Sequence, residues 1–120
     1  MRLQKTFSLD IYSCKIVLII SEDLFEEERK LCEKHEDEYS EIIPSDGLTI
    51  NFENDIYYIL FKIDSISHNL LAHEIYHLVC SITDYRSIME EESRAWLCGY
   101  LTDLIYSYLQ NKKITIRNGF

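Results

Sequence analysis

The segment His73-Glu74-Ile75-Tyr76-His77 places two imidazoles and a carboxylate within a few residues of one another. If the segment is helical, the two histidines project from one face, one turn apart, and can hold one tetrahedral zinc ion. Glu74 then lies about 100° around the helix from His73, beside the metal, where it can act as general base on a zinc-bound water. The pattern predicts one zinc ion per chain, with His73 and His77 as ligands.

A histidine on an apolar helix is often a buried side chain that hydrogen-bonds to the backbone, and either imidazole alone would suit that interpretation. The spaced pair favours a metal, because two imidazoles and a carboxylate on an apolar helix need partners that offset their desolvation. An apolar stripe at helical spacing predicts that this helix is buried nearly all round. The stripe consists of Leu71, Ile75, Leu78 and Ile82.

Zinc peptidases use a third protein ligand and leave the fourth position to water. The acidic candidates and the other nearby imidazole are His68, Asp84, Glu90, Glu91, Glu92 and Asp103. We favour Glu92, because the small residues Ala95 and Gly99 lie close to its side of a predicted helix and would let that helix approach the histidine helix closely. The alternative that Glu90, Glu91 and Glu92 are all solvated surface charges stays open.

Two segments of the chain resemble a known family. They read SHNLLAHEIYH at 67–77 and ESRAWLCGYL at 92–101, and they are similar to small zincin-like proteins encoded by phages and prophages. The similarity covers roughly residues 47 to 105. It implies a gluzincin-type metallopeptidase in which the second helix supplies a glutamate ligand, which maps onto Glu92. Trp96 departs from the pattern, since some gluzincins have an acidic residue one turn after that ligand.

These features predict a zinc-dependent metallopeptidase that acts on a peptide or protein substrate. Glu74 would take a proton from the zinc-activated water and pass it to the leaving amine. The segment 56–63 could be an edge strand on which an extended peptide pairs, or an ordinary sheet strand. An oxyanion donor could come from Tyr76, Tyr85 or His68. The alternatives are a catalytically silent, zinc-stabilised binding module of phage or mobile-element origin, and a metal-free α+β interaction domain.

Composition narrows the class of protein. A chain of 120 residues suits one domain, residues 1–120. A net charge of −9 with only 12 basic residues argues against a nucleic-acid partner, since phosphates are held by clustered Lys and Arg. The longest apolar run, 16–20, is far too short to span a membrane.

The cysteines at 14, 32, 80 and 98 have no Cys-x-x-Cys spacing, which indicates small apolar side chains in a reducing, cytoplasmic setting. The oligomeric state cannot be predicted.

The residue patterns predict an α+β fold, a minimal zincin-like domain with a small, mainly antiparallel sheet packed on the two helices that carry the site. Strands are expected at 3–12 and 14–20, the second buried on both faces. A helix capped by Ser21 is expected at 22–36. A hairpin of 48–52 and 56–63 precedes a helix at 67–82, capped by Ser65 or Ser67, and a second helix at 87–110. A strand at 114–116 is expected to close the sheet.

Overall fold

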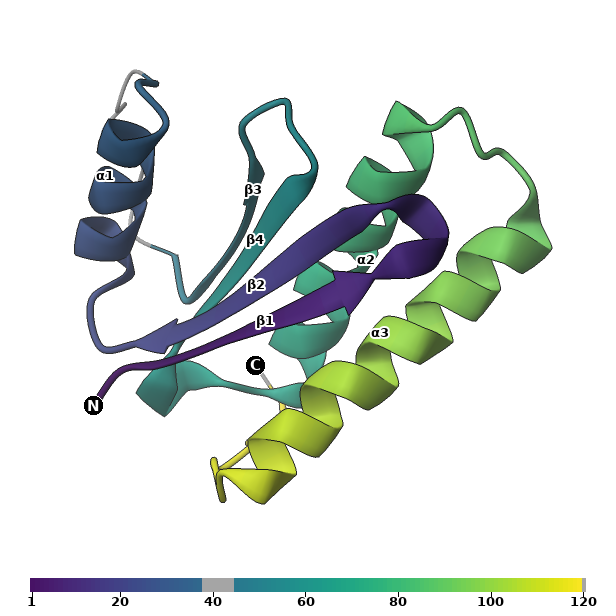
Figure 1. The fold of residues 1–120 in the computed structure, drawn as a ribbon. Coiled ribbons are helices and arrows are strands. Elements are labelled where there is room, and N and C mark those ends of the chain that lie inside the picture. The colour runs from purple at the N-terminus through teal and green to yellow at the C-terminus, as the bar shows by residue number, and fades with distance from the viewer. Residues whose placement is uncertain (38–44, 120) are drawn as a thin grey trace. The chain divides into compact units, whose positions relative to one another are not determined.

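The computed structural model describes residues 1–37 and 45–119. Its contacts divide the chain into two units, Met1–Ser65 and Ile66–Phe120, and each unit is described separately below. Within the described residues the chain contains four β-strands and three α-helices, which confirms the α+β class (Figure 1). No described helix is long and apolar enough to cross a membrane.

The first unit is built on a four-stranded sheet. Its strands are β1 (Leu3–Leu9), β2 (Cys14–Ser21), β3 (Gly47–Asn51) and β4 (Ile56–Lys62), in the order β1-β2-β4-β3. The pair β3/β4 is antiparallel, as the hairpin pattern predicted, and β1/β2 is antiparallel too, whereas β2 and β4 are parallel. The sheet is therefore mixed, with two antiparallel pairs and one parallel pair. A parallel pair needs a long connection, and here the segment between β2 and β4 contains both a helix and β3.

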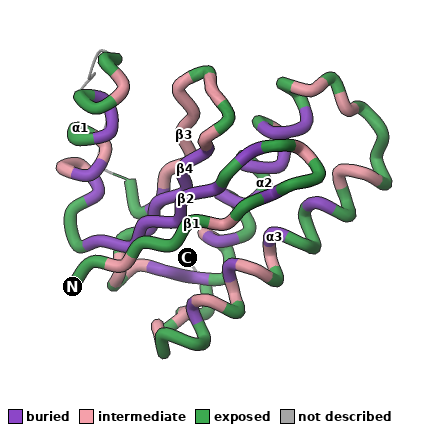
Figure 2. The backbone as a smooth tube through the Cα atoms, in the orientation of Figure 1, coloured by how far each residue is buried: buried purple, intermediate pink, exposed green. Residues whose placement is uncertain are grey.

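The two central strands are buried on both faces, which confirms the prediction for β2 (Figure 2). The parallel register pairs Val17 with Tyr58 and Ile19 with Leu60, so these side chains form one face of the sheet. Helix α1 (Leu24–Lys34) packs on this face through Leu24 and Leu31. The residues on the opposite face of β2 and β4 are buried as well, which explains why β2 reads as a continuous apolar run.

Helix α1 begins two residues later than the sequence predicted, because Asp23 rather than Ser21 is the N-cap. The Asp23 carboxylate accepts a hydrogen bond from the Glu26 amide at 3.1 Å, whereas Ser21 lies in β2 and its hydroxyl accepts from the Asp23 amide at 3.3 Å. An aspartate at this position also suits the positive end of the helix dipole. The expected strand-to-helix junction is thus present, but two residues further along the chain.

Strand β4 lies in the middle of the sheet, hydrogen-bonded to β2 on one side and to β3 on the other. Its backbone groups are used by these neighbours, so an extended peptide cannot add to it. Of the two alternatives left open for 56–63, an edge strand or an ordinary sheet strand, the structure has the second, and the edges are β1 and β3. The residue pattern of a hairpin strand is the same whether or not a third strand pairs with its far side.

The second unit consists of α2 (His68–Tyr85), α3 (Glu91–Asn111) and the segment that follows them. The expected strand at 114–116 does not form. Instead, Arg117 makes an isolated parallel bridge with Ser67: its amide donates to the Ile66 carbonyl at 2.8 Å, and its carbonyl accepts from the His68 amide at 3.1 Å. The end of the chain therefore holds the start of α2.

Two residues after the end of each of the three helices, a non-glycine residue has the left-handed conformation. These residues are Glu36, Ser87 and Lys113. At the end of α2, the Ile88 amide donates to the Thr83 carbonyl and the Ser87 amide donates to the Asp84 carbonyl, which is the Schellman pattern of helix termination. This geometry explains why α3 does not begin at Ser87 as expected. Ser87 belongs to the termination of α2, whose last residue is Tyr85, and α3 starts at Glu91.

Replacing Gly99 by alanine should stabilise the protein. Gly99 lies inside α3, it is exposed, and a Cβ built on it meets no atom within 4 Å. Because alanine is favoured over glycine in a helix interior, Gly99→Ala should raise the free energy of unfolding by about 1 kcal/mol. Urea denaturation followed by circular dichroism measures the change, and a loss of stability would show that the position is sterically closed.

Candidate functional site

Helix α2 carries the predicted site, and its first turn is fixed by Ser67. The Ser67 hydroxyl accepts a hydrogen bond from the Leu70 amide at 3.0 Å, as an N-cap does, and Ser67 is only 2% exposed. Of the two caps that the sequence left open, Ser67 is the one used. Together with the Arg117 bridge, this cap sets where α2 starts.

The two histidines meet on the surface of α2. Their Nε2 atoms lie 3.1 Å apart, and their ring centroids lie 4.7 Å apart with the ring planes at 76°. Both rings are exposed, with 62% of the His73 side chain accessible to solvent. The i,i+4 spacing therefore brings the two Nε2 atoms to one point outside the helix, as predicted.

Glu74 has a different environment from its two histidine neighbours. Its side chain is 8% exposed, and its Oε2 lies 3.8 Å from the Nε2 of His73. The carboxylate thus reaches the same nitrogen that would bind a metal, from the buried side of the helix. This position suits a group that exchanges a proton with a water at the histidine pair.

The histidine pair has the geometry of two zinc ligands. Zinc–nitrogen bonds of about 2.0–2.1 Å at a tetrahedral angle separate two ligand nitrogens by about 3.3 Å, close to the 3.1 Å found here. Without a metal, two neutral imidazoles at this distance can share one proton, one Nε2 donating and the other accepting. A zinc ion would replace that proton, so the pair fits the metal in both donor type and spacing.

The face of α2 that carries the histidines is open to solvent, which corrects the expectation of a helix buried nearly all round. One side of α2 is buried, at Leu71, Ile75, Leu78 and Ile82, as predicted. On the other side His73, Tyr76 and His77 are exposed. The error arose because the apolar stripe was weighed without the polar stripe opposite it. A ligand or substrate can therefore reach the histidine pair from solvent.

Tyr76 lies next to the pair, and its ring centroid is 6.5 Å from that of His77. A hydrogen bond with the Cys80 thiol raises the pKa of the Tyr76 hydroxyl, so the hydroxyl stays neutral and keeps its proton at physiological pH. His68, another residue considered as an oxyanion donor, is engaged with Tyr106, with 2.9 Å between its Nδ1 and the hydroxyl oxygen. Of Tyr76 and His68, Tyr76 is therefore the candidate donor that lies beside the histidine pair.

Glu92 is not brought to the histidine pair. Helices α2 and α3 form a hairpin whose register is set by His68–Tyr106 at one end and by the Asp84–Arg94 ion pair at the other. Interpolating between these contacts puts His77 opposite about residue 99, so Glu92 lies about 10 Å further along α3 at 1.5 Å per residue. Glu92 is also exposed and lies about 180° around α3 from the buried Leu101.

The reason for choosing Glu92 also depended on a close approach at Gly99 and Ala95, and this approach is absent. Both residues are exposed, and a Cβ added at Gly99 would meet no described atom within 4 Å beyond those of its chain neighbours and the adjacent backbone of α3. Across residues 1–37 and 45–119, no three side chains of His, Cys, Asp or Glu are grouped so that they could hold a metal ion. The structure thus assembles His73, His77 and Glu74, and leaves Glu92 outside this group.

The cysteines divide into two kinds. Cys14 and Cys32 are buried, as small apolar side chains should be, whereas Cys80 is partly exposed and Cys98 is exposed. All four are free thiols. The sequence pattern had not separated them, because burial depends on which face of its helix or strand each one occupies.

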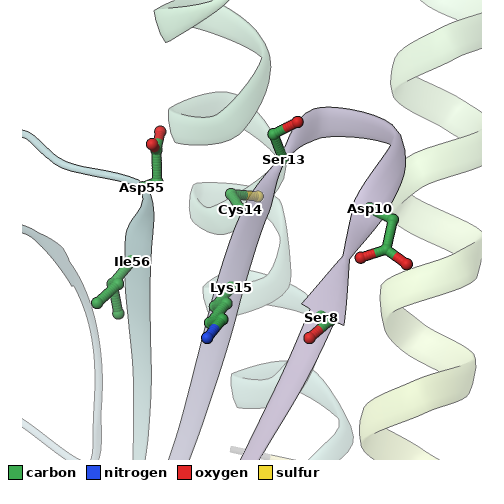
Figure 3. Close-up of a pocket in the computed structure, with 7 residues that line it drawn as sticks. All are labelled: Ser8, Asp10, Ser13, Cys14, Lys15, Asp55 and Ile56. Carbon is green, nitrogen blue, oxygen red and sulfur yellow. The ribbon is translucent and has the colours of Figure 1, made fainter.

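The first unit has a cavity of its own, of about 270 Å³, at the turn between β1 and β2 (Figure 3). Figure 3 labels its lining residues: Ser8, Asp10, Ser13, Cys14, Lys15, Asp55 and Ile56. It lies where the parallel strands β2 and β4 begin, whereas ligands of open sheets with parallel strands usually bind at the carboxyl ends. Its mixed lining of carboxylates, an ammonium group and hydroxyls points to no single reaction, so the histidine pair remains the better candidate.

Comparison of this chain with protein-family models, with curated proteins and with solved structures found no match.

Removing the Ser67 cap should weaken the helix that carries the site. Ser67→Ala leaves the Leu70 amide without its side-chain acceptor, and the expected cost is about 1 kcal/mol of unfolding free energy. Ser67→Asp restores an acceptor and should recover most of that loss. Thermal and urea denaturation of both variants measure the effect, and equal losses in the two would show that the cap does not fix the start of α2.

Proposed function

We propose that this protein is a zinc-dependent peptide hydrolase in which His73 and His77 hold the metal and Glu74 is the general base. The observation that supports the proposal is the Nε2–Nε2 distance of 3.1 Å on an exposed helix face, with the Glu74 carboxylate 3.8 Å from one of these nitrogens. Such a donor pair beside a carboxylate is the arrangement that metal-assisted hydrolysis uses.

The roles of the three residues follow from their positions. When bound, zinc would polarise the scissile carbonyl and lower the pKa of a water towards neutrality. His73 and His77 orient their Nε2 atoms to one point outside α2. Glu74 accepts the proton of the attacking water and delivers it to the leaving amine, and its buried position leaves it a restricted set of orientations for both transfers.

The third protein ligand stays a prediction from the sequence, with Glu92 as the first candidate. The resemblance to gluzincins supports it, whereas the exposed position of Glu92 on α3 does not. Coordination by Glu92 would need a change in the α2–α3 hairpin, because Glu92 lies about 10 Å along α3 from the point opposite His77. A direct test of the ligands therefore comes before any test of activity.

Zinc analysis of ligand variants tests the metal site. Protein purified without chelator should contain about one zinc per chain, and His73→Ala or His77→Ala should remove most of it. Glu92→Ala should weaken zinc binding roughly 10-fold or more if Glu92 is a ligand. The matched control is Glu91→Ala, the exposed neighbour on the same helix, which should bind zinc normally. Full zinc in Glu92→Ala would remove Glu92 from the ligand set.

Catalysis is tested separately with Glu74→Gln, which keeps the size of the side chain and removes its basicity. The variant should retain zinc and lose about 10²- to 10⁴-fold in peptide hydrolysis. Cleavage of a peptide library, read by mass spectrometry, provides the assay, and Glu91→Gln serves as the control for loss of one carboxylate.

If the zinc-loaded wild-type protein cleaves nothing in the library, the silent zinc-stabilised binding module becomes the better interpretation. Undiminished turnover in Glu74→Gln would remove Glu74 from the mechanism.

A further inference from the structure

Helix α3 presents two large aromatic rings to solvent. Trp96 is 49% exposed and Tyr100 is 38% exposed. Their ring centroids lie 5.2 Å apart and the ring planes are nearly parallel, at 7°. The two residues are one helical turn apart, and their rings stack in parallel on the outside of the helix, as a pair that we call the Trp96–Tyr100 surface. Aromatic residues held rigidly at the surface are typical of binding surfaces.

Two carboxylates share this side of α3 with the rings. At 100° per residue, Glu92, Trp96, Gly99 and Asp103 lie within about 60° of one another, opposite the buried stripe of Leu97, Leu101, Ile105 and Leu109. Gly99 lies between the two aromatic positions, and the space over its backbone is open. The outward face of α3, defined here as Glu92, Trp96, Gly99, Tyr100 and Asp103, is therefore aromatic at its centre and acidic towards both ends.

No basic side chain of α3 neutralises this face. The only one in the helix is Arg94. Its guanidinium is bound elsewhere, since Nε donates to the Ile88 carbonyl at 3.1 Å and Nη2 forms the ion pair with Asp84. The carboxylates of the outward face thus keep their charge available for a partner, in a chain whose net charge is −9.

We propose that the outward face of α3 docks an arginine-bearing segment of a partner protein. A guanidinium is planar and cationic, so it can stack on the Trp96–Tyr100 surface while its N–H groups donate to a carboxylate. The open space at Gly99 leaves room for the aliphatic stem of the arginine beside the rings. A purely apolar partner would leave the two carboxylates without compensation, and an anionic partner would be repelled. The face needs no metal, and Glu92 is the residue that it shares with the hydrolase proposal.

Trp96 is the only tryptophan of the chain, which makes its fluorescence a reporter placed at the proposed surface. The experiment titrates the full chain, with EDTA present, with a tryptophan-free peptide of alternating Arg and Gly, and in parallel with the matching Lys and Gly peptide. The Arg peptide should change the Trp96 emission and bind several-fold more tightly than the Lys peptide. Because EDTA removes zinc, failure here would leave the hydrolase proposal untouched, and the reverse also holds.

Variants locate the binding. Tyr100→Leu should weaken binding of the Arg peptide about 3- to 5-fold, and Asp103→Asn should weaken it by a similar factor. The matched controls are Tyr85→Leu, an exposed tyrosine outside the face, and Glu91→Gln, an equal change of charge on the same helix; both should bind normally. Equal affinity for the Arg and Lys peptides with unchanged Trp96 emission would overturn the proposal. Equal losses of affinity for the Arg peptide in a variant and its control would also overturn it. So would concentration-dependent self-association of the protein that Tyr100→Leu abolishes.

Discussion

The 3.6-residue repeat of a single helix is the constraint on which the candidate site depends. It alone brings the Nε2 atoms of His73 and His77 to 3.1 Å, without any contact from a distant part of the chain. What the rest of the second unit contributes is the position at which that repeat starts. The Ser67 cap and the Arg117 bridge fix the first residues of α2, and burial of Leu71, Ile75 and Leu78 keeps the histidines on the outside.

The same distinction between local and distant interactions explains what the sequence could predict. The histidine pair, the β3–β4 hairpin and the Ser67 cap depend on residues within a few positions of one another, and each was found as expected. The parallel pairing of β2 with β4 joins segments about 40 residues apart, and the pattern of one strand does not identify the strand with which it pairs. The sequence therefore left the position of β4 open between edge and interior, and it did not predict Arg117 next to Ser67.

Glu92 depends on a distant contact in the same way. The helical repeat predicts that Glu92 and Trp96 share one face of α3 and that Leu97 and Leu101 share the other, and Leu97 and Leu101 are buried. The small residues near Glu92 predicted a close helix approach on the first face. Gly99 is instead open to solvent. A helical pattern shows which residues share a side, but the register of the hairpin, set here by His68–Tyr106 and Asp84–Arg94, decides what each side meets.

These positions tie the two proposals together. Glu92 and Trp96 are one turn apart on the same side of α3, so any movement that carries Glu92 to the histidine pair carries the Trp96–Tyr100 surface with it. If zinc recruits Glu92, the aromatic surface would come to border the metal, and an arginine docked there would compete with substrate. If zinc is held without Glu92, the metal and the aromatic surface act separately. The ligand set of the zinc therefore decides whether α3 belongs to the catalytic site or only to a docking surface.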